Sequence, residues 1–332
     1  MLRVPSRPAV SPGRLVTLAL GAAALFSFTL VPPAIGCSMC RCGDPTFNAL
    51  GTDVYAEGNF RIAIDGERFE KEQAISEHDH EEEAVTAEEE HEHGREGQVE
   101  RRVTATLSYA FDRVNLVARI PWSDRELRTI GESGSETSNG LADPELYALV
   151  RLWSSPFQGD LGRRAWLSAV GGVKTPWGEN DLKSDGERLE EHLQSGTGST
   201  DWFGGFSGVY LVDSQSSLFG SLQYRKMGTN DFDYRYGDVR LLNFGYERKL
   251  GKRIDASLEA NYRDADQDSI DADGELDPNT GGSVLYLSPR LSADFGRGLV
   301  GRLSFQIPVA DRLDGDQTEK AVANFGLTFL VR

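Results

Sequence analysis

The sequence predicts an all-β protein built as a single transmembrane antiparallel β-barrel, and three observations lead to this fold class. Apolar and polar residues alternate with a period of two through most of the chain. The connections between the alternating segments are short and long in turn. The chain starts with an export signal, yet beyond it no apolar run is long enough for a membrane-spanning helix.

Residues 1–36 have the layout of a secretory signal peptide. Three arginines precede an uncharged apolar run over 15–31, and small residues at Ala34 and Gly36 end the segment before Cys37. A basic head, an apolar middle and a small-residue exit predict cleavage and export. Cleavage would make Cys37 the first residue, where it could carry a lipid. An uncleaved membrane anchor is the alternative.

The alternation marks about twelve strands of roughly 10–14 residues, a length that suits tilted strands crossing a bilayer. Segment 253–264 is the clearest, with apolar residues at every second position, and in segment 236–249 the pattern leaves the two faces unassigned. The segments cover about 54–64, 102–111, 114–122, 141–154, 164–175, 199–212, 216–227, 236–249, 253–264, 282–295, 298–309 and 321–331.

Connection length is the second regularity. The short connections fall at 112–113, 155–163, 213–215, 250–252 and 296–297, and the long ones at 65–99, 124–140, 176–198, 228–235, 265–281 and 310–320. Short turns at one end, long loops at the other and an even strand number are typical of bacterial outer-membrane barrels. We therefore predict a periplasmic N-terminal segment over 37–50 and an outer-membrane barrel over 51–332, with 65–99 as an external loop.

The polar faces of these strands are predicted to line the lumen, because a charge facing the hydrocarbon midplane costs about 2–4 kcal/mol. All five tryptophans lie near predicted strand ends, as in the aromatic girdles of membrane barrels. The predicted lumen residues are Arg61, Arg119, Glu145, Arg151, Lys174, Arg225, Glu259, Arg263 and Arg302.

Cys37, Cys40 and Cys42 lie close together at the predicted mature N-terminus. Three thiolates could bind one soft metal ion such as Cu(I) or Zn²⁺. In an oxidising compartment a disulfide among them is the alternative. If Cys37 carries a lipid, a site with three thiols is excluded.

Four of the five histidines fall within the predicted external loop 65–99, at His78, His80, His91 and His93, and carboxylates surround them. Neutral imidazole binds Zn²⁺, Cu²⁺ and Ni²⁺, and the carboxylates raise the local cation concentration. We predict weak binding of a divalent transition metal here. A hydrated acidic loop with incidental histidines is the alternative.

A second acidic loop has some features of a calcium site. Asp264, Asp266, Asp268 and Glu275 supply oxygen atoms at four positions of a calcium-binding loop, but Ser269 stands where the turn requires glycine. An acidic surface loop that binds no specific ion fits the same residues, and calcium is the weaker prediction.

The formal net charge of −17 argues against nucleic-acid binding, since phosphates would be repelled. Residues 67–100 contribute −11 and residues 264–277 contribute −7, so the acidity is concentrated in two predicted external loops.

We predict no enzymatic activity. Outside the acidic loop the sole histidine is His192, next to Ser195 in a loop, where no strand would hold a catalytic pair in place.

Several short motifs resemble one known family. They are Gly140-Leu-Ala-Asp143, Gly171-Gly-Val-Lys-Thr-Pro176, Leu193-Gln-Ser-Gly-Thr-Gly-Ser-Thr-Asp201, Leu285-Tyr-Leu-Ser-Pro-Arg-Leu291 and Phe305-Gln-Ile-Pro-Val309. Over about residues 100–331 the chain resembles outer-membrane transporters of the MetA-pathway-of-phenol-degradation type. The resemblance implies a barrel in the outer membrane of a Gram-negative bacterium. The chain departs from such barrels in ending on Arg332 rather than an aromatic residue.

The predicted function is an outer-membrane transporter or channel for a small solute, linked to the handling of divalent transition metals. Its predicted partners are outer-membrane lipid, lipopolysaccharide and the solute or metal ion. The alternative is a non-conducting barrel that binds metal or docks a periplasmic protein through its N-terminal cysteines. An importer of aromatic hydrocarbons follows only from the family resemblance and would require an apolar track through the lumen.

Overall fold

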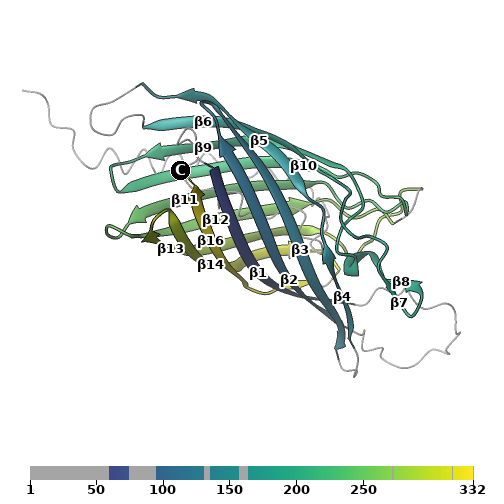
Figure 1. The fold of residues 1–332 in the computed structure, drawn as a ribbon. Helices are drawn as coiled ribbons and strands as arrows, with labels where there is room; N and C mark the ends of the chain where they lie inside the picture. The colour runs from purple at the N-terminus through teal and green to yellow at the C-terminus, as the bar shows by residue number, and fades with distance from the viewer. Residues whose placement is uncertain are drawn as a thin grey trace, which may run out of the picture. The chain divides into compact units, whose positions relative to one another are not determined.

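The computed structural model describes residues 60–74, 95–130, 135–156, 164–270, 273–315 and 317–331. Twelve long antiparallel strands form one closed barrel, since β1 pairs with β2 on one side and with β16 on the other (Figure 1). The strands are β1 Phe60–Ala74, β2 Arg95–Ala110, β3 Val114–Ile130, β5 Glu145–Ser154, β6 Ala165–Lys174, β9 Asp201–Leu211, β10 Ser216–Lys226, β11 Val239–Lys249, β12 Ile254–Ala265, β13 Gly282–Gly296, β14 Leu299–Leu313 and β16 Val322–Val331. The predicted fold class is confirmed.

The remaining elements are short. Strand β4 (Glu136–Leu141) pairs with β3, and β15 (Thr318–Glu319) pairs with β1. A hairpin of β7 (Lys183–Ser184) and β8 (Glu187–Arg188) precedes the 3-10 helix η4 (Glu191–Leu193). In the described part of the chain, no helix has the length and apolar character needed to span a membrane.

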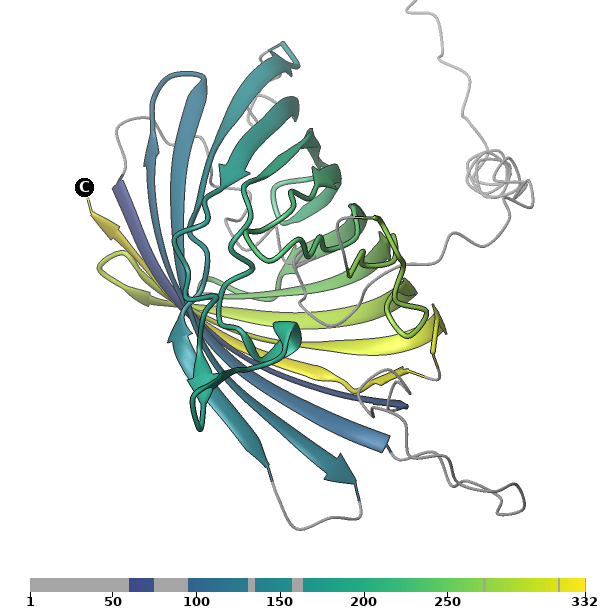
Figure 2. The same cartoon turned by 90° about the vertical axis from the view of Figure 1, so that its right-hand side faces the viewer.

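The two ends of the barrel differ in their connections. Phe60 pairs with both Val331 and Tyr109, so the first and last described residues of the barrel lie beside the short turn at 111–113. The long connections lie at the opposite end, and Figure 2 shows this end facing the viewer, with coil segments lying across the ring of strands. This separation of short and long connections agrees with the prediction.

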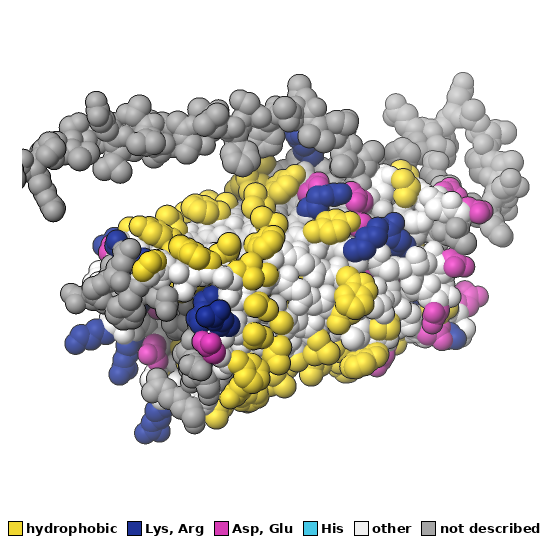
Figure 3. Space-filling view, turned by 90° about the horizontal axis from the view of Figure 1, so that it is seen from above, with side chains coloured by type: hydrophobic (Ala, Val, Ile, Leu, Met, Phe, Trp, Pro, Cys, Tyr) yellow, Lys and Arg dark blue, Asp and Glu magenta, His cyan; other side chains and the backbone are white. Residues whose placement is uncertain are grey.

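The outer face of the barrel is apolar because alternate side chains point outward. On β11, Leu242 and Phe244 are 52 % and 58 % exposed, whereas Leu241 and Asn243, which alternate with them, are each 3 % exposed. Figure 3 shows hydrophobic side chains spread over the outer face and acidic side chains gathered toward the end with the long connections. An apolar band of this kind is what a barrel in lipid requires.

Strands β1, β2 and β3 are longer than predicted. The loop predicted over 65–99 is wrong at both ends, because β1 continues to Ala74 and β2 starts at Arg95. The predicted loop 124–140 likewise contains the end of β3 and all but the last residue of β4. Exposed ion pairs such as Arg101–Asp124, at 3.0 Å, occupy these extensions. Outward-facing charged residues are tolerated where strands extend beyond the hydrocarbon. These parts of the strands are polar on both faces, so in the sequence they resemble loops.

Candidate functional site in the barrel lumen

The connection between β6 and β9, residues 175–200, folds against the inside of the barrel, and we call it the lumen loop. Its residues 193–197 are all buried. Gln98 Nε2 of β2 donates to the His192 carbonyl at 3.0 Å, and Arg125 Nη1 of β3 donates to the same oxygen at 2.9 Å. The lumen loop is therefore held by inward-facing side chains of neighbouring strands.

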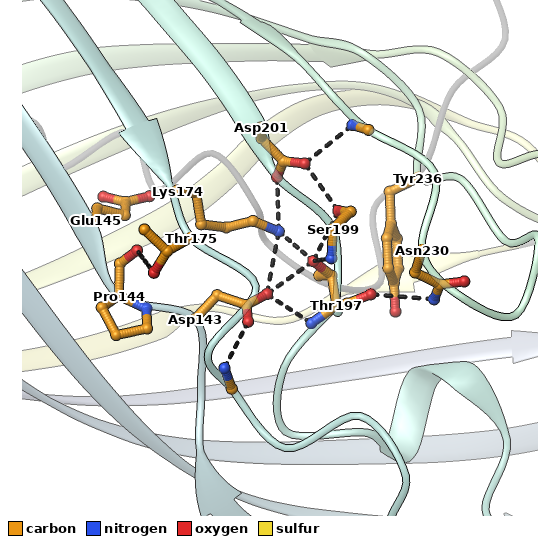
Figure 4. A network of polar contacts seen from close by, with 12 residues as sticks. Asp143, Pro144, Glu145, Lys174, Thr175, Thr197, Ser199, Asp201, Asn230 and Tyr236 are labelled. Atoms are coloured by element: carbon orange, nitrogen blue, oxygen red, sulfur yellow. Dashed lines mark hydrogen bonds and ion pairs between the residues drawn. The ribbon is translucent and has the colours of Figure 1, made fainter.

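Lys174, at the end of β6, is the centre of the contacts between the lumen loop and the wall (Figure 4). Its Nζ lies 3.2 Å from Asp143 Oδ2 and 2.6 Å from Asp201 Oδ2, and it donates to Thr197 Oγ1. The side chains of Lys174, Asp143 and Asp201 are at most 6 % exposed. Burying three charges is unfavourable unless they pair with one another, as they do here.

Asp143 reaches the lumen because the wall is irregular between β4 and β5. Leu141 pairs with Trp122 and Glu145 pairs with Arg119, so three residues on one strand lie opposite two on the other. A bulge of this kind redirects side chains. The Asp143 carboxylate accepts hydrogen bonds from the Gly178 amide at 2.8 Å and from the Thr197 amide at 2.7 Å.

Two glycines allow the lumen loop to approach Asp143 closely. A Cβ on Gly196 would lie 2.7 Å from the Gly178 Cα and 2.8 Å from Asp143 Oδ1. Gly198 has φ +68°, and a Cβ there would lie 1.7 Å from the Asn180 side chain. A side chain at Gly196 would therefore collide with Asp143 of the wall, and one at Gly198 would collide with Asn180 within the lumen loop.

Asp201 connects the network to the next long connection, residues 227–238 between β10 and β11. Its Oδ1 accepts hydrogen bonds from Ser199 Oγ at 2.8 Å and from the Gly228 amide at 3.0 Å. Asn230 Nδ2 donates to the Thr197 carbonyl at 3.0 Å. The two connections therefore support each other inside the barrel.

A second set of contacts joins the outer part of the lumen loop to its neighbours. The Tyr236 hydroxyl donates to the Glu191 carbonyl at 3.1 Å, and the rings of Tyr234 and Tyr236 lie against His192. Burial, together with the positive charges of Lys71 and Arg125, lowers the pKa of His192 to about 3. His192 is thus neutral at physiological pH while the lumen loop is docked.

A small cavity of about 60 Å³ lies between the lumen loop and the wall, and we call it the arginine cavity. Its cationic lining consists of Arg102, Arg119, Arg125, Lys174 and Arg225. Within it Glu145 is 2.7 Å from Arg225 and 3.3 Å from Arg119. The cavity is therefore strongly polar, with more cationic than anionic side chains in its lining.

An apolar cluster lies next to the arginine cavity on the same inward faces. It consists of Val117, Tyr147, Leu149, Val170 and Phe203, which are between 3 % and 7 % exposed. Val117 and Tyr147 are each two residues from a charged cavity residue on the same strand, so they share its face. The polar zone and the apolar cluster are thus adjacent parts of one surface.

Four of the predicted lumen residues meet at this site: Arg119, Glu145, Lys174 and Arg225. The structure places the others elsewhere along the barrel: Arg61, Arg151, Glu259, Arg263 and Arg302. Four of these have ion-pair partners, namely Arg290 for Glu259, Glu319 for Arg263, Asp65 for Arg302 and Asp112 for Arg151. Arg151 donates to the Asp112 carbonyl at the short-turn end.

The predicted metal residues divide into two groups. Cys37, Cys40, Cys42, His78, His80, His91 and His93 lie outside the described residues. The predicted calcium ligands are described, and they do not converge. Asp264 and Asp266 both face Arg240, whereas Asp268 accepts hydrogen bonds from Tyr234 and the Gly237 amide. Across the described ranges no cluster of three or more His, Cys, Asp or Glu could hold a metal ion.

Sequence reasoning did not identify Asp143, Thr197, Ser199 and Asp201 as functional residues. The sequence did contain a signal for these four residues, because all of them lie within the motifs that carry the family resemblance. His192 and Ser195, considered above as a catalytic pair, have different surroundings: His192 lies against two tyrosines, and Ser195 lines the arginine cavity.

Comparison with known proteins agrees with this architecture. Among solved structures, an outer membrane channel from Pseudomonas putida F1 is similar over 85 % of this chain and 99 % of that chain, with a TM-score of 0.59 and 10 % identity. The β domain of the Bordetella autotransporter BrkA has a TM-score of 0.48 at 10 % identity, covering 83 % of this chain and 100 % of that chain. The CymD monoaromatic hydrocarbon channel has a TM-score of 0.42 at 9 % identity, covering 91 % and 95 %.

The TM-score of 0.59 shows that this chain shares the fold of the Pseudomonas putida F1 channel, and the fold is that of an outer-membrane barrel. No curated protein matches the sequence. A family model described as "Putative MetA-pathway of phenol degradation" matches residues 87–319, which is more than half of the chain. The predicted resemblance is thus confirmed, and the chain belongs to this family of outer-membrane β-barrels.

Proposed function

We propose that this barrel is a channel for small solutes and that the lumen loop sets the width of its passage. The observation that carries the proposal is the network at Lys174, which fixes the lumen loop to the wall from inside. The fold likeness to a solved outer membrane channel supports the same function.

The passage is narrow for two reasons. A barrel of about twelve strands is intermediate in width between barrels of about eight strands, which side chains fill, and porins of 16–18 strands, which leave an aqueous channel. The lumen loop and the connection 227–238 then occupy part of that space, joined by Asn230 and Gly228. Solutes that pass must be small, or the lumen loop must move.

An importer of neutral aromatic hydrocarbons is the second candidate. The observation that favours it is the apolar cluster around Phe203, which provides a surface for an aromatic ring inside the lumen. The neighbouring arginine cavity favours solutes that carry polar groups. The two candidates differ in the solute and share the barrel.

The other functional predictions remain predictions. Handling of Zn, Cu or Ni and docking of a periplasmic protein rest on cysteines and histidines outside the described residues. Binding of lipopolysaccharide and weak binding of calcium are likewise untested. A non-conducting barrel would have the same lumen-loop contacts as a channel. Only a measurement of solute passage distinguishes the two.

Swelling of liposomes that contain the purified full-length barrel tests the proposal. Liposomes loaded with an impermeant polymer are diluted into isotonic arabinose, sucrose or raffinose. We expect swelling in arabinose, slower swelling in sucrose and none in raffinose, since the passage admits only small solutes. Equal impermeability to all three sugars would overturn the channel and favour the non-conducting barrel.

A further inference from the structure

Five cationic side chains and two carboxylates line the arginine cavity, and Glu100 beside it lies 2.7 Å from Arg102 and 3.8 Å from Arg125. Asp143 and Glu145 are the two acidic residues in the lining, and both are already engaged. Asp143 accepts from Lys174 and from two backbone amides. Glu145 pairs with both Arg119 and Arg225. A third acceptor would find donors already arranged around it.

Two buried donors at the cavity have no hydrogen-bond partner among the described residues. Ser195 Oγ, on a residue that is 2 % exposed, lines the cavity without an acceptor. Arg125 Nε, on a residue that is 3 % exposed, also lacks one. A buried donor without an acceptor is unfavourable, so such groups are rare unless a water or a ligand completes them. Both therefore indicate an acceptor that is supplied from outside the chain.

The lining also has an apolar side. Pro121 and Ala142 form part of it, and Phe203 of the apolar cluster lies 4.3 Å from the guanidinium of Arg225. The volume of about 60 Å³ is several times the roughly 10–15 Å³ that one water requires. The space suits a group of a few heavy atoms, with Pro121 and Ala142 on its apolar side.

We infer that the arginine cavity binds the carboxylate of a small organic acid whose apolar body lies toward the apolar cluster. Guanidinium groups match the two oxygens of a carboxylate, and Ser195 Oγ donates a further hydrogen bond. The inference deepens the proposed channel function and rests on it, because the ligand must enter through the lumen. It assigns the solute class as aromatic or short aliphatic carboxylates.

Isothermal titration calorimetry on the purified full-length barrel in detergent tests the inference, with benzoate as the probe. We expect saturable binding of benzoate and binding of benzyl alcohol that is roughly tenfold weaker, because the alcohol lacks the charged oxygens. Ser195→Ala should weaken benzoate binding several-fold, and Arg225→Gln should weaken it more. Arg240→Gln is the matched control, since it removes the same charge from an exposed position, and benzoate binding should be unchanged.

Equal affinity for benzoate and benzyl alcohol would overturn the inference, as would benzoate binding that neither cavity variant weakens. Ser195→Ala keeps the test decisive if Arg225→Gln fails to fold. Passage of arabinose without benzoate binding would overturn the inference and leave the channel intact. Benzoate binding without passage of any sugar would overturn the channel and leave the cavity as a ligand site.

Discussion

The two sides of the barrel lumen use charged side chains differently. On the side of β5, β6 and β9, Lys174 connects the wall to the lumen loop through Asp143 and Asp201. On the opposite wall, Arg302 pairs with Asp65 at 2.6 Å, so charges of β14 and β1 satisfy each other along the wall. One set of charges fixes a movable segment and the other stiffens the barrel. The two regions should therefore respond differently to mutation.

Removal of the Lys174 charge should produce the largest effect. In Lys174→Met, Asp143 and Asp201 would remain buried without their cation. Breaking a buried ion pair in this way costs about 3–5 kcal/mol. We expect the Thr197 amide, now bonded to Asp143, to lose protection from hydrogen exchange while amides of the barrel strands keep theirs.

Lys226→Met is the matched control for this variant. Lys226 pairs with Asp238 at 2.9 Å, but its side chain is 59 % exposed, so its loss should cost less than about 1 kcal/mol. Equal exchange at Thr197 in both variants would contradict the view that Lys174 fixes the lumen loop.

Overpacking at the contact between the lumen loop and the wall should have an intermediate effect. In Gly196→Ala the new Cβ would lie 2.8 Å from Asp143 Oδ1 of the wall and 2.7 Å from the Gly178 Cα of the lumen loop, and overpacking of this kind typically costs about 1–3 kcal/mol. Gly171→Ala on β6 is the control, because its Cβ would meet nothing within 4 Å. Hydrogen exchange at Thr197 should increase in the first variant alone, and equal exchange in the two would contradict the close approach.

Mild acidification, to about one unit below the ordinary pKa of histidine, should have the smallest effect on the lumen loop. The pKa of His192 is lowered to about 3 when the loop is docked, against about 6.5 for an exposed histidine. Between these values the undocked loop binds a proton that the docked loop does not. Docking is therefore fully favoured above about pH 6.5 and weakens as the pH falls toward 3.

The mobility of a spin label at Ser184→Cys measures this pH dependence, with the three native cysteines replaced by serine. Mobility should rise on acidification in the wild-type background and rise less in His192→Gln. Burial raises the pKa of the adjacent Glu191, which has the opposite effect, so the difference between the two backgrounds isolates His192. Identical pH profiles would show that His192 does not control docking.

The strand pattern of the lipid-facing part of the barrel could be predicted from the sequence. In β12 the outward residues Leu258 and Tyr262 alternate with inward polar residues, as expected from period two. In β11 the neighbouring Leu241 and Leu242 are both apolar, so the pattern does not show which points inward. Gly245 faces inward, where a Cβ would lie 2.4 Å from the ring of Phe219. The two residues are far apart in the sequence, so the local sequence does not show that glycine is needed there.

The site could be predicted only in part, because it is assembled from distant segments. Lys174 was predicted to face the lumen from its strand alone. Asp143 and Thr197 were not assigned, since their role depends on a bulge and on a loop that folds back into the barrel. Alternation describes strands and carries no information about where a long connection packs.

The most direct test of the central claim is single-channel conductance in planar bilayers. The wild-type barrel is compared with a variant in which residues 180–192 of the lumen loop are replaced by a short Gly-Ser linker. If the lumen loop sets the width of the passage, the wild-type barrel has a small conductance and the variant a several-fold larger one. Equal conductance in the two barrels, or silence in both, would contradict the account.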